Sequence, residues 1–189
     1  AIRCLTRDGR LIFTGGAKFQ LLAFTVYVDD QLCLLGQATG AAFNRRGKWF
    51  QRPQADLQAE RQIAFDLRIM SIAVINNNSS EYVTLVTGSS IGDLCIYHFC
   101  RRTSTFALRS KASTTVHGHH PVLALAVWNG HVISTDTRGR VALWTLQDVE
   151  LRHVQTVSGV HQSGINCISV LGLDQEMMVM VTGGDDHAW

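Results

Sequence analysis

The sequence lacks the features that mark membrane-spanning and disulfide-stabilised proteins. No apolar run is long enough for a transmembrane helix, no signal peptide is recognisable, and the mean hydropathy is only +0.08. The five cysteines are odd in number and form no CxxC pair. We therefore expect reduced core thiols in a soluble, cytoplasmic protein that makes no membrane contact.

Charge and catalytic motifs are also scarce. Only 17% of the residues are charged and the net charge is +2, so a nucleic-acid role would have to rest on a local patch. No GxSxG, P-loop or GxGxxG motif is present. The adjacent acids, Asp29 with Asp30 and Asp185 with Asp186, fall in turns, where such side chains cap the backbone. We expect no catalytic residue, no cofactor and no metal.

What the sequence does contain is a pattern of short strands, clearest between His120 and Leu146. An apolar run at 122–127 is followed by Asn129 and Gly130, then by a β-branched run at 131–136. After the turn residues 137–139, a third run places Val141 and Leu143 on one face and Ala142 and Trp144 on the other. The pattern predicts three antiparallel strands joined by tight turns.

This unit repeats along the chain. The run that starts at Val122 recurs at Ile165, which is 43 residues later. Repeats of roughly 40–45 residues with four strands each are typical of β-propeller blades, because one small sheet cannot bury its faces alone. With 46% apolar residues, the chain can form the core that such a fold needs.

The repeats resemble the WD-repeat (WD40) family, which implies an all-β propeller. We expect about three and a half four-stranded blades, at about 1–40, 66–110, 116–158 and, incomplete, 160–189, with an insertion at 41–65. Three and a half blades cannot close a ring, so the chain is expected to be part of a larger propeller with two uncovered blade faces.

The family's blades contain a buried hydrogen-bond chain of His, Ser or Thr, Asp and Trp. The resemblance implies this structural role for His161, Thr182 and Asp186 in the fourth unit, and for Trp144 at the Trp position of the third. Tyr97 and Phe24 take the Trp position in the second and first units. Six residues before these three, where the family has Asp, stand other residue types: Arg138, Ile91 and Lys18.

These departures imply a divergent propeller that depends more on apolar packing than its relatives do. The tract His117-Gly118-His119-His120 looks like a metal site, but its Gly-His pair matches the family's loop before the first strand. No Cys or carboxylate stands beside it at ligand spacing, so we expect no metal there.

The insertion separates the first two units and has its own composition. Its first half carries basic and aromatic residues without an acid, a combination that can hold phosphates and stack on bases. Its second half, 53–65, contains good helix formers. The insertion is thus either an RNA or partner contact, or a solvated loop with aromatics packed on the blade edge. The candidate contact residues are Arg45, Arg46, Lys48, Trp49, Phe50 and Arg52.

A narrower resemblance links the segments 66–71, 161–166 and 183–186 to the family of WD repeat-containing protein 6. Its members are non-catalytic partners of a tRNA ribose 2′-O-methyltransferase that modifies the anticodon wobble nucleotide. The resemblance implies that tRNA and this methyltransferase are partners, and that S-adenosylmethionine belongs to the enzyme. The alternative is a generic WD40 protein-interaction scaffold, such as a ubiquitin-ligase substrate receptor or a signalling adaptor.

Overall fold

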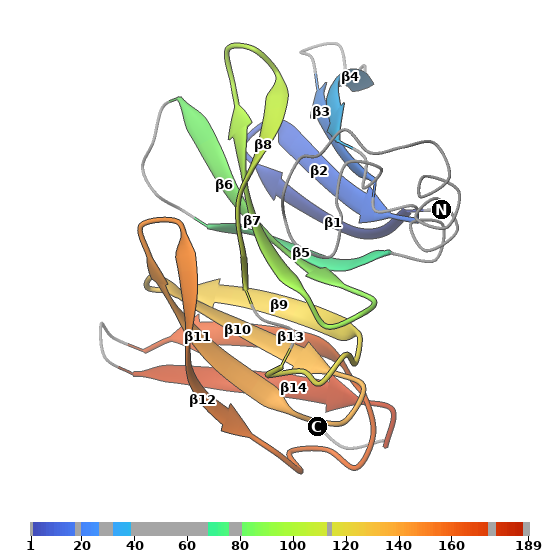
Figure 1. The fold of residues 1–189 in the computed structure, drawn as a ribbon, viewed down its shortest axis with the longest axis vertical. Helices are drawn as coiled ribbons and strands as arrows, with labels where there is room; N and C mark the ends of the chain where they lie inside the picture. Colours follow the sequence, from blue (N-terminus) through green and yellow to red (C-terminus); the bar gives the residue numbers. More distant parts are fainter. Residues whose placement is uncertain are drawn as a thin grey trace, which may run out of the picture.

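We describe a computed structural model of the chain that covers residues 2–17, 20–26, 32–38, 68–75, 81–112, 115–173 and 177–186. These residues form fourteen β-strands in four antiparallel sheets stacked beside one another (Figure 1). No helix able to cross a lipid bilayer occurs in these ranges. The all-β propeller architecture predicted from the repeats is confirmed.

Three of the sheets have four strands in chain order, and the fourth sheet has two. The first sheet consists of β1 (Ile2–Asp8), β2 (Leu11–Gly16), β3 (Leu21–Val26) and β4 (Leu32–Ala38). The second consists of β5 (Ile69–Ile75), β6 (Tyr82–Ser89), β7 (Leu94–Cys100) and β8 (Thr105–Ala112). The third consists of β9 (Val122–Trp128), β10 (His131–Asp136), β11 (Val141–Gln147) and β12 (Glu150–Val157), and the fourth of β13 (Ile165–Gly172) and β14 (Met178–Gly184).

The predicted turn between β9 and β10 has the expected geometry. Asn129 and Gly130 have φ angles of 45° and 75°, the left-handed values that a two-residue type I′ hairpin turn requires. Asn and Gly adopt these values more readily than other residues do. The turn residues therefore set the register in which Trp128 faces His131.

Phe24, Tyr97 and Trp144 occupy equivalent places, as predicted. Each is the fourth residue of its strand, in β3, β7 and β11. Each also follows directly on a register shift against the outermost strand of its sheet. The shared bulge shows that the three sheets are structural repeats even though the aromatic residue differs.

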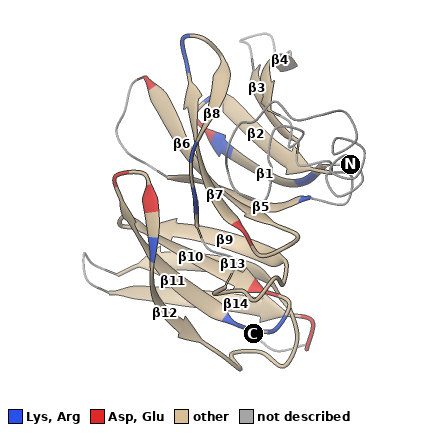
Figure 2. Ribbon diagram, in the orientation of Figure 1, with Lys and Arg blue, Asp and Glu red and all other residues tan. Residues whose placement is uncertain are grey.

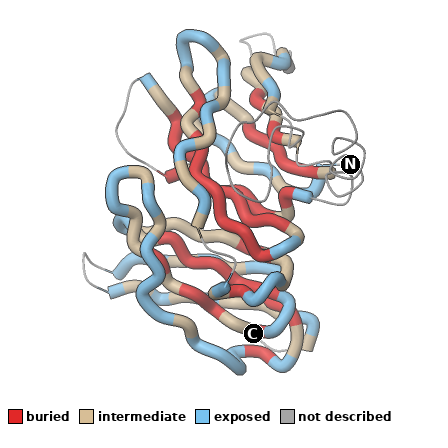
Figure 3. The backbone as a smooth tube through the Cα atoms, in the orientation of Figure 1, coloured by how far each residue is buried: buried red, intermediate tan, exposed pale blue. Residues whose placement is uncertain are grey.

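Apolar residues pack between neighbouring sheets rather than within one sheet. One cluster joins the first two sheets through Phe13 and Phe99, whose ring centroids lie 5.3 Å apart. A second joins sheets two and three around Ile96 and Trp144, and a third joins sheets three and four through Ile133 and Ile165. The buried segments accordingly run through the middle strands, while β8 and β12 are largely exposed (Figure 3).

The predicted side-chain faces are correct for β11 and partly wrong for β9. Ala142 and Trp144 belong to the cluster on one side of β11 and Val141 and Leu143 to that on the other, as predicted. Strict alternation of side chains along the run 122–127 also predicts Leu123 on the same face of β9 as Leu125 and Val127. This prediction is wrong for Leu123. A bulge pairs Asp136 with Val122 and Thr135 with Ala124, so the extra residue Leu123 instead lies beside Gly164, at the entrance to β13.

The cysteines are less buried than predicted. All five lie on strands and are free thiols, but only Cys95 is buried, and Cys167 is exposed. Burial raises the pKa of the Cys95 thiol to about 12 and, at partly buried Cys4, to about 11. These two thiols are therefore protonated and unreactive at neutral pH.

The innermost strands β1, β5, β9 and β13 lie next to one another. Hydroxyls on β5 and β10 bond to the first strand of the following sheet. The hydroxyl of Ser71 donates to the Val122 carbonyl, and that of Thr135 donates to the Ile165 carbonyl, both at 2.9 Å. Gly88 stands where Thr135 stands in the next sheet, and a Cβ there would lie 2.6 Å from Val122 Cγ1. Neighbouring sheets therefore approach too closely at Gly88 for a larger residue.

The faces at the two ends of the stack expose apolar side chains. Leu171, Val179 and Val181 in the fourth sheet are 65%, 44% and 54% exposed. In the first sheet, Ile2 and Leu5 are each 63% exposed. These side chains make an apolar surface at each end of the stack, as expected for uncovered blade faces.

Candidate functional site

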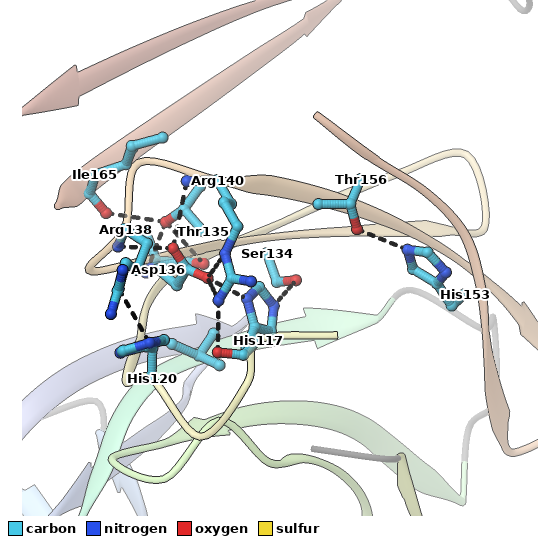
Figure 4. Close-up of polar contacts among 12 residues, drawn as sticks. His117, His120, Ser134, Thr135, Asp136, Arg138, Arg140, His153, Thr156 and Ile165 are labelled. Atoms are coloured by element: carbon cyan, nitrogen blue, oxygen red, sulfur yellow. Dashed lines mark hydrogen bonds and ion pairs between the residues drawn. The ribbon is translucent and has the colours of Figure 1, made fainter. Parts of the chain in front are cut away.

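The most organised polar group in the third sheet is centred on His117 (Figure 4). Its Nδ1 lies 2.9 Å from Asp136 Oδ2 and its Nε2 lies 2.7 Å from the hydroxyl of Ser134. The indole N–H of Trp144 donates to the same hydroxyl, also at 2.7 Å. These bonds fit an imidazole that donates from Nδ1 and accepts the Ser134 proton at Nε2.

The Asp136 carboxylate is held by several donors from the β10–β11 turn. Its Oδ1 accepts the backbone N–H groups of Arg138 and Arg140, and its Oδ2 accepts Nε of Arg140 at 2.7 Å. Burial alone would raise the pKa of Asp136. The hydrogen bonds from His117, Arg138 and Arg140 outweigh that effect and lower the pKa to about 2. The carboxylate is thus ionised throughout the physiological range.

This network corrects the prediction about the acid of the third unit. Counting six residues back from Trp144 gives Arg138 and predicts that the third unit has no acid, yet Asp136, two residues earlier, supplies it. The histidine of the network is His117, which comes directly before the Gly-His pair. The turn brings Asp136 to the imidazole because Gly139, at φ +67°, folds the chain back while Arg138 and Arg140 donate to the carboxylate. A signal was present, since Asp136 is the only acid between His117 and Gln147.

The fourth sheet contains a similar group made from residues that the resemblance singled out. Nδ1 of His161 lies 2.8 Å from Asp186 Oδ1, and Nε2 lies 2.9 Å from the Thr182 hydroxyl. The backbone N–H of Gln162 donates to the other oxygen of Asp186 at 2.7 Å. The structure brings together His161, Thr182 and Asp186, and the last residues, 187–189, lie outside the described part of the chain.

The first two sheets keep only fragments of this arrangement. Thr14 stands at the place of Ser134, but the side chain of Phe24 has no N–H to donate to it. The buried Thr14 hydroxyl has no partner among the described residues. In the second sheet the acid is displaced to Asp93, which is buried and lies 2.6 Å from Nζ of Lys111. One of its oxygens, Oδ1, lacks a partner within the described ranges.

A Ser, His and Asp in hydrogen-bond contact is also the arrangement of a hydrolase triad, so access decides its chemistry. Ser134 and Asp136 are 0% exposed and His117 is 1% exposed. The Ser134 hydroxyl, moreover, already accepts the Trp144 N–H. A nucleophile must be able to reach a substrate carbonyl, and this one cannot, so the network stiffens the sheet instead.

The histidines beside this network do not gather as a metal site. No cluster of three His, Cys, Asp or Glu side chains occurs in the ranges that the structure covers. Nε of Arg138 donates to His120 Nε2 at 3.1 Å, and His119 is exposed with φ of 65°. The predicted contact residues Arg45, Arg46, Lys48, Trp49, Phe50 and Arg52, like all of 39–67, lie outside the described residues.

Comparison with solved structures shows the fold. Sqt1 of Chaetomium thermophilum, bound to the N-terminus of ribosomal protein L10, matches 98% of this chain with a TM-score of 0.63 and 20% identity. The computationally designed Ika4 protein matches 100% of it at 0.56 and 16% identity, over 88% of its own length. A Bacteroides uniformis protein described as a 6-phosphogluconolactonase matches 88% at 0.57 and 13% identity, over 45% of its own length.

These matches identify the sheets as blades of a WD40-type propeller such as that of Sqt1. The chain spans 41% of the Sqt1 chain that it matches. Scans against family models and against curated protein sequences gave no match. The narrower resemblance to the family of WD repeat-containing protein 6 therefore rests on the short sequence motifs alone.

Proposed function

We propose that this chain belongs to a non-catalytic propeller scaffold that holds a protein partner. The observation that carries the proposal is the complete burial of the Ser134, His117 and Asp136 side chains. These three side chains, the groups best suited to catalysis, stabilise the third sheet and are closed to solvent. The turns between strands carry the residues that the described part of the chain presents to other molecules.

The likeness to Sqt1 supports this proposal at the level of the fold. That propeller is bound to the N-terminus of a ribosomal protein, so stacked sheets of this kind can present a surface to a protein segment. The lactonase-like structure shows that the fold alone does not exclude an enzyme. The enclosed network weighs against one here, because a reacting group must be accessible to its substrate.

The partner that we propose is a tRNA ribose 2′-O-methyltransferase, with tRNA as the bound substrate. The support is the sequence resemblance of 66–71, 161–166 and 183–186 to the family of WD repeat-containing protein 6. In this proposal S-adenosylmethionine and the chemistry belong to the enzyme, and the complex is cytoplasmic. A ubiquitin-ligase receptor or a signalling adaptor is the alternative scaffold, and neither needs RNA.

The test is to purify the full-length protein from cells and identify what accompanies it. We expect a methyltransferase and tRNA, and loss of wobble-nucleotide 2′-O-methylation when the scaffold is depleted. Ubiquitin-ligase subunits or signalling proteins without RNA would instead support the alternative. Methyl transfer by the purified protein without any partner would contradict the scaffold proposal as a whole.

The basic and aromatic cluster of the insertion can be tested in the same protein. We expect replacement of Arg45, Arg46, Lys48 and Arg52 by Ala to weaken tRNA binding and to reduce its dependence on salt. Each phosphate contact that is lost lowers the number of counterions released when tRNA binds. Association with the methyltransferase should persist. Unchanged tRNA affinity and salt dependence would rule out an RNA contact, and dissociation of the enzyme would identify a protein-docking element.

A further inference from the structure

One end of the second and third sheets carries exposed basic side chains, at the point where β5 and β9 begin and the β6–β7 and β10–β11 turns lie (Figure 2). We call Arg68, His119, His120 and Arg138 the basic surface. Arg68, His119 and Arg138 are exposed, and His120 is half-buried. Figure 2 also shows Lys and Arg on β8, on β12 and around the β1–β2 turn.

Contacts between loops connect the members of the basic surface. The backbone N–H of Arg68 donates to the Ser90 hydroxyl at 3.1 Å, which places Arg68 on the β6–β7 turn. In that turn, a Cβ on Gly92 would lie 3.0 Å from the His120 carbonyl oxygen and 3.3 Å from His119 Cα. His120 in turn accepts Nε of Arg138 at 3.1 Å (Figure 4). The loops that carry these four residues therefore lie against one another across two sheets.

The acids at this end are each engaged by another group. Asp93 and Asp136 are 3% and 0% exposed, and each is already paired, with Lys111 and with Arg140. Asp185, exposed in the turn after β14, accepts a hydrogen bond from Nδ2 of Asn166. Within the part of the chain that the structure describes, neither Arg68 nor Arg138 has an acidic partner. Their charges face solvent, where an anionic group can meet them without first breaking an ion pair.

Arg138 is held in a geometry suited to a carboxylate. Its backbone N–H donates to Asp136 Oδ1 at 2.8 Å, and its Nε is directed to His120. With Nε engaged, the two Nη groups are left to form parallel hydrogen bonds with both oxygens of a carboxylate. The side chain is thus partly oriented before binding, which lowers the entropy that a ligand has to offset.

We propose that the basic surface binds an acidic segment, rich in Asp and Glu, of a protein partner. The inference rests on the proposed scaffold function and names the chemistry that its partner would present. A single-stranded nucleic acid is the less suitable ligand, because such sites combine positive charge with exposed aromatic rings. Among the described residues of the basic surface and its two turns, no Phe, Tyr or Trp occurs.

The experiment measures fluorescence anisotropy of the full-length protein with a short labelled peptide of alternating Glu and Gly, against its Gln and Gly counterpart. We expect the Glu peptide to bind more tightly. Arg138→Gln and Arg68→Gln should each weaken its binding by about five- to tenfold, the effect of losing a partly exposed charge-assisted hydrogen bond. Arg152→Gln, which removes an exposed charge from β12, is the matched control and should leave binding unchanged.

Equal binding of the Glu and Gln peptides would overturn the proposal, as would equal losses in Arg138→Gln and Arg152→Gln. So would an Arg138→Gln protein that loses tRNA affinity but keeps the Glu peptide, because the surface would then be an RNA site. Arg138 is exposed, and the Gln that replaces it keeps the backbone N–H that donates to Asp136. The variant is therefore expected to fold, with an unchanged near-ultraviolet circular dichroism spectrum. If the peptide binds while no protein partner co-purifies, the scaffold proposal fails and the binding site stands.

Discussion

The imidazole of His117 and the hydroxyl of Ser134 form a hydrogen bond of 2.7 Å in a region closed to solvent. Around this bond the indole of Trp144 and the carboxylate of Asp136 complete a chain that spans the loop before β9 and the strands β10 and β11. A buried polar chain is costly when one member is missing, because the partners left behind are desolvated without compensation. The stability of the third sheet should therefore depend on each member.

Replacement of the buried acid should change how stability depends on pH. The folded-state pKa of Asp136, about 2, lies below its ordinary value of 3.8. Ionised Asp136 therefore stabilises the fold fully above about pH 5 and loses this contribution, about 2 kcal/mol, as the pH falls to 2. We expect Asp136→Asn to lower the free energy of urea unfolding at pH 7 by at least about 2 kcal/mol, and the difference from the wild type to shrink toward pH 3.

The control for this prediction is Asp148→Asn. Asp148 is exposed in the β11–β12 turn with φ of 55°, a conformation that Asn adopts readily. Its free energy of unfolding should stay near that of the wild type at every pH. A difference between Asp136→Asn and wild type that stays constant from pH 7 to pH 3 would show that the Asp136 charge does not contribute as we infer.

The equivalent hydroxyls of the first and fourth sheets should respond oppositely to Thr→Val. Thr14 is buried without a partner among the described residues, so Thr14→Val removes an uncompensated polar atom and should raise the free energy of unfolding, by up to about 1 kcal/mol. Thr182 bonds to His161, so Thr182→Val should lower it by about 1–2 kcal/mol. Urea denaturation measures both. A loss of stability in Thr14→Val would show that this hydroxyl has a partner.

Close contact between the second and third sheets should make Gly88 intolerant of a side chain. A Cβ there would lie 2.4 Å from Ser71 Oγ and 2.6 Å from Val122 Cγ1, which belong to two different sheets. We expect Gly88→Ala to force the sheets apart and to lower the free energy of unfolding by about 1–3 kcal/mol. At Gly183 a Cβ would meet, among the described residues, only the Cys167 thiol of the same sheet, so Gly183→Ala should cost less. Thermal unfolding of the two variants gives the comparison.

A charge on β9 should disrupt the packing between the same two sheets. Leu125 is partly buried against the cluster that contains Ile96 and Trp144. We expect Leu125→Asp to lower the free energy of unfolding by about 2–3 kcal/mol, since the carboxylate would lie in an apolar region. Val154→Asp is the control, because Val154 is 53% exposed on β12. Wild-type stability in Leu125→Asp would contradict the assigned face of this strand.

The sequence allowed the strands and their repeat to be predicted because both depend on local alternation and on turn residues such as Asn129 and Gly130. The Trp position could also be found, since Phe24, Tyr97 and Trp144 follow the strand period. The acid could not be found by counting. A carboxylate at the end of β10 reaches His117 as well as one placed in the turn does, and this depends on the backbone path around Gly139 rather than on spacing.

The displaced position of Leu123 had a similar cause. A bulge opposite Thr135 shifts the alternation of β9 by one residue, and nothing in the run 122–127 marks where the extra residue lies. The basic surface escaped sequence analysis because Arg68, His119 and Arg138 are far apart in the chain. Only the stacking of two sheets brings them to one end.

The hydrogen bond from Thr135 to the Ile165 carbonyl joins a donor to an acceptor that is synthesised later. During synthesis the Thr135 hydroxyl leaves the ribosome thirty residues before its acceptor. The Ser71 hydroxyl leaves fifty-one residues before its acceptor, the Val122 carbonyl. The second and third sheets thus each hold a hydroxyl that bonds to water until the following sheet docks. Interruption of translation between two sheets would release a nascent chain whose last sheet is hydrated where the following sheet would otherwise cover it.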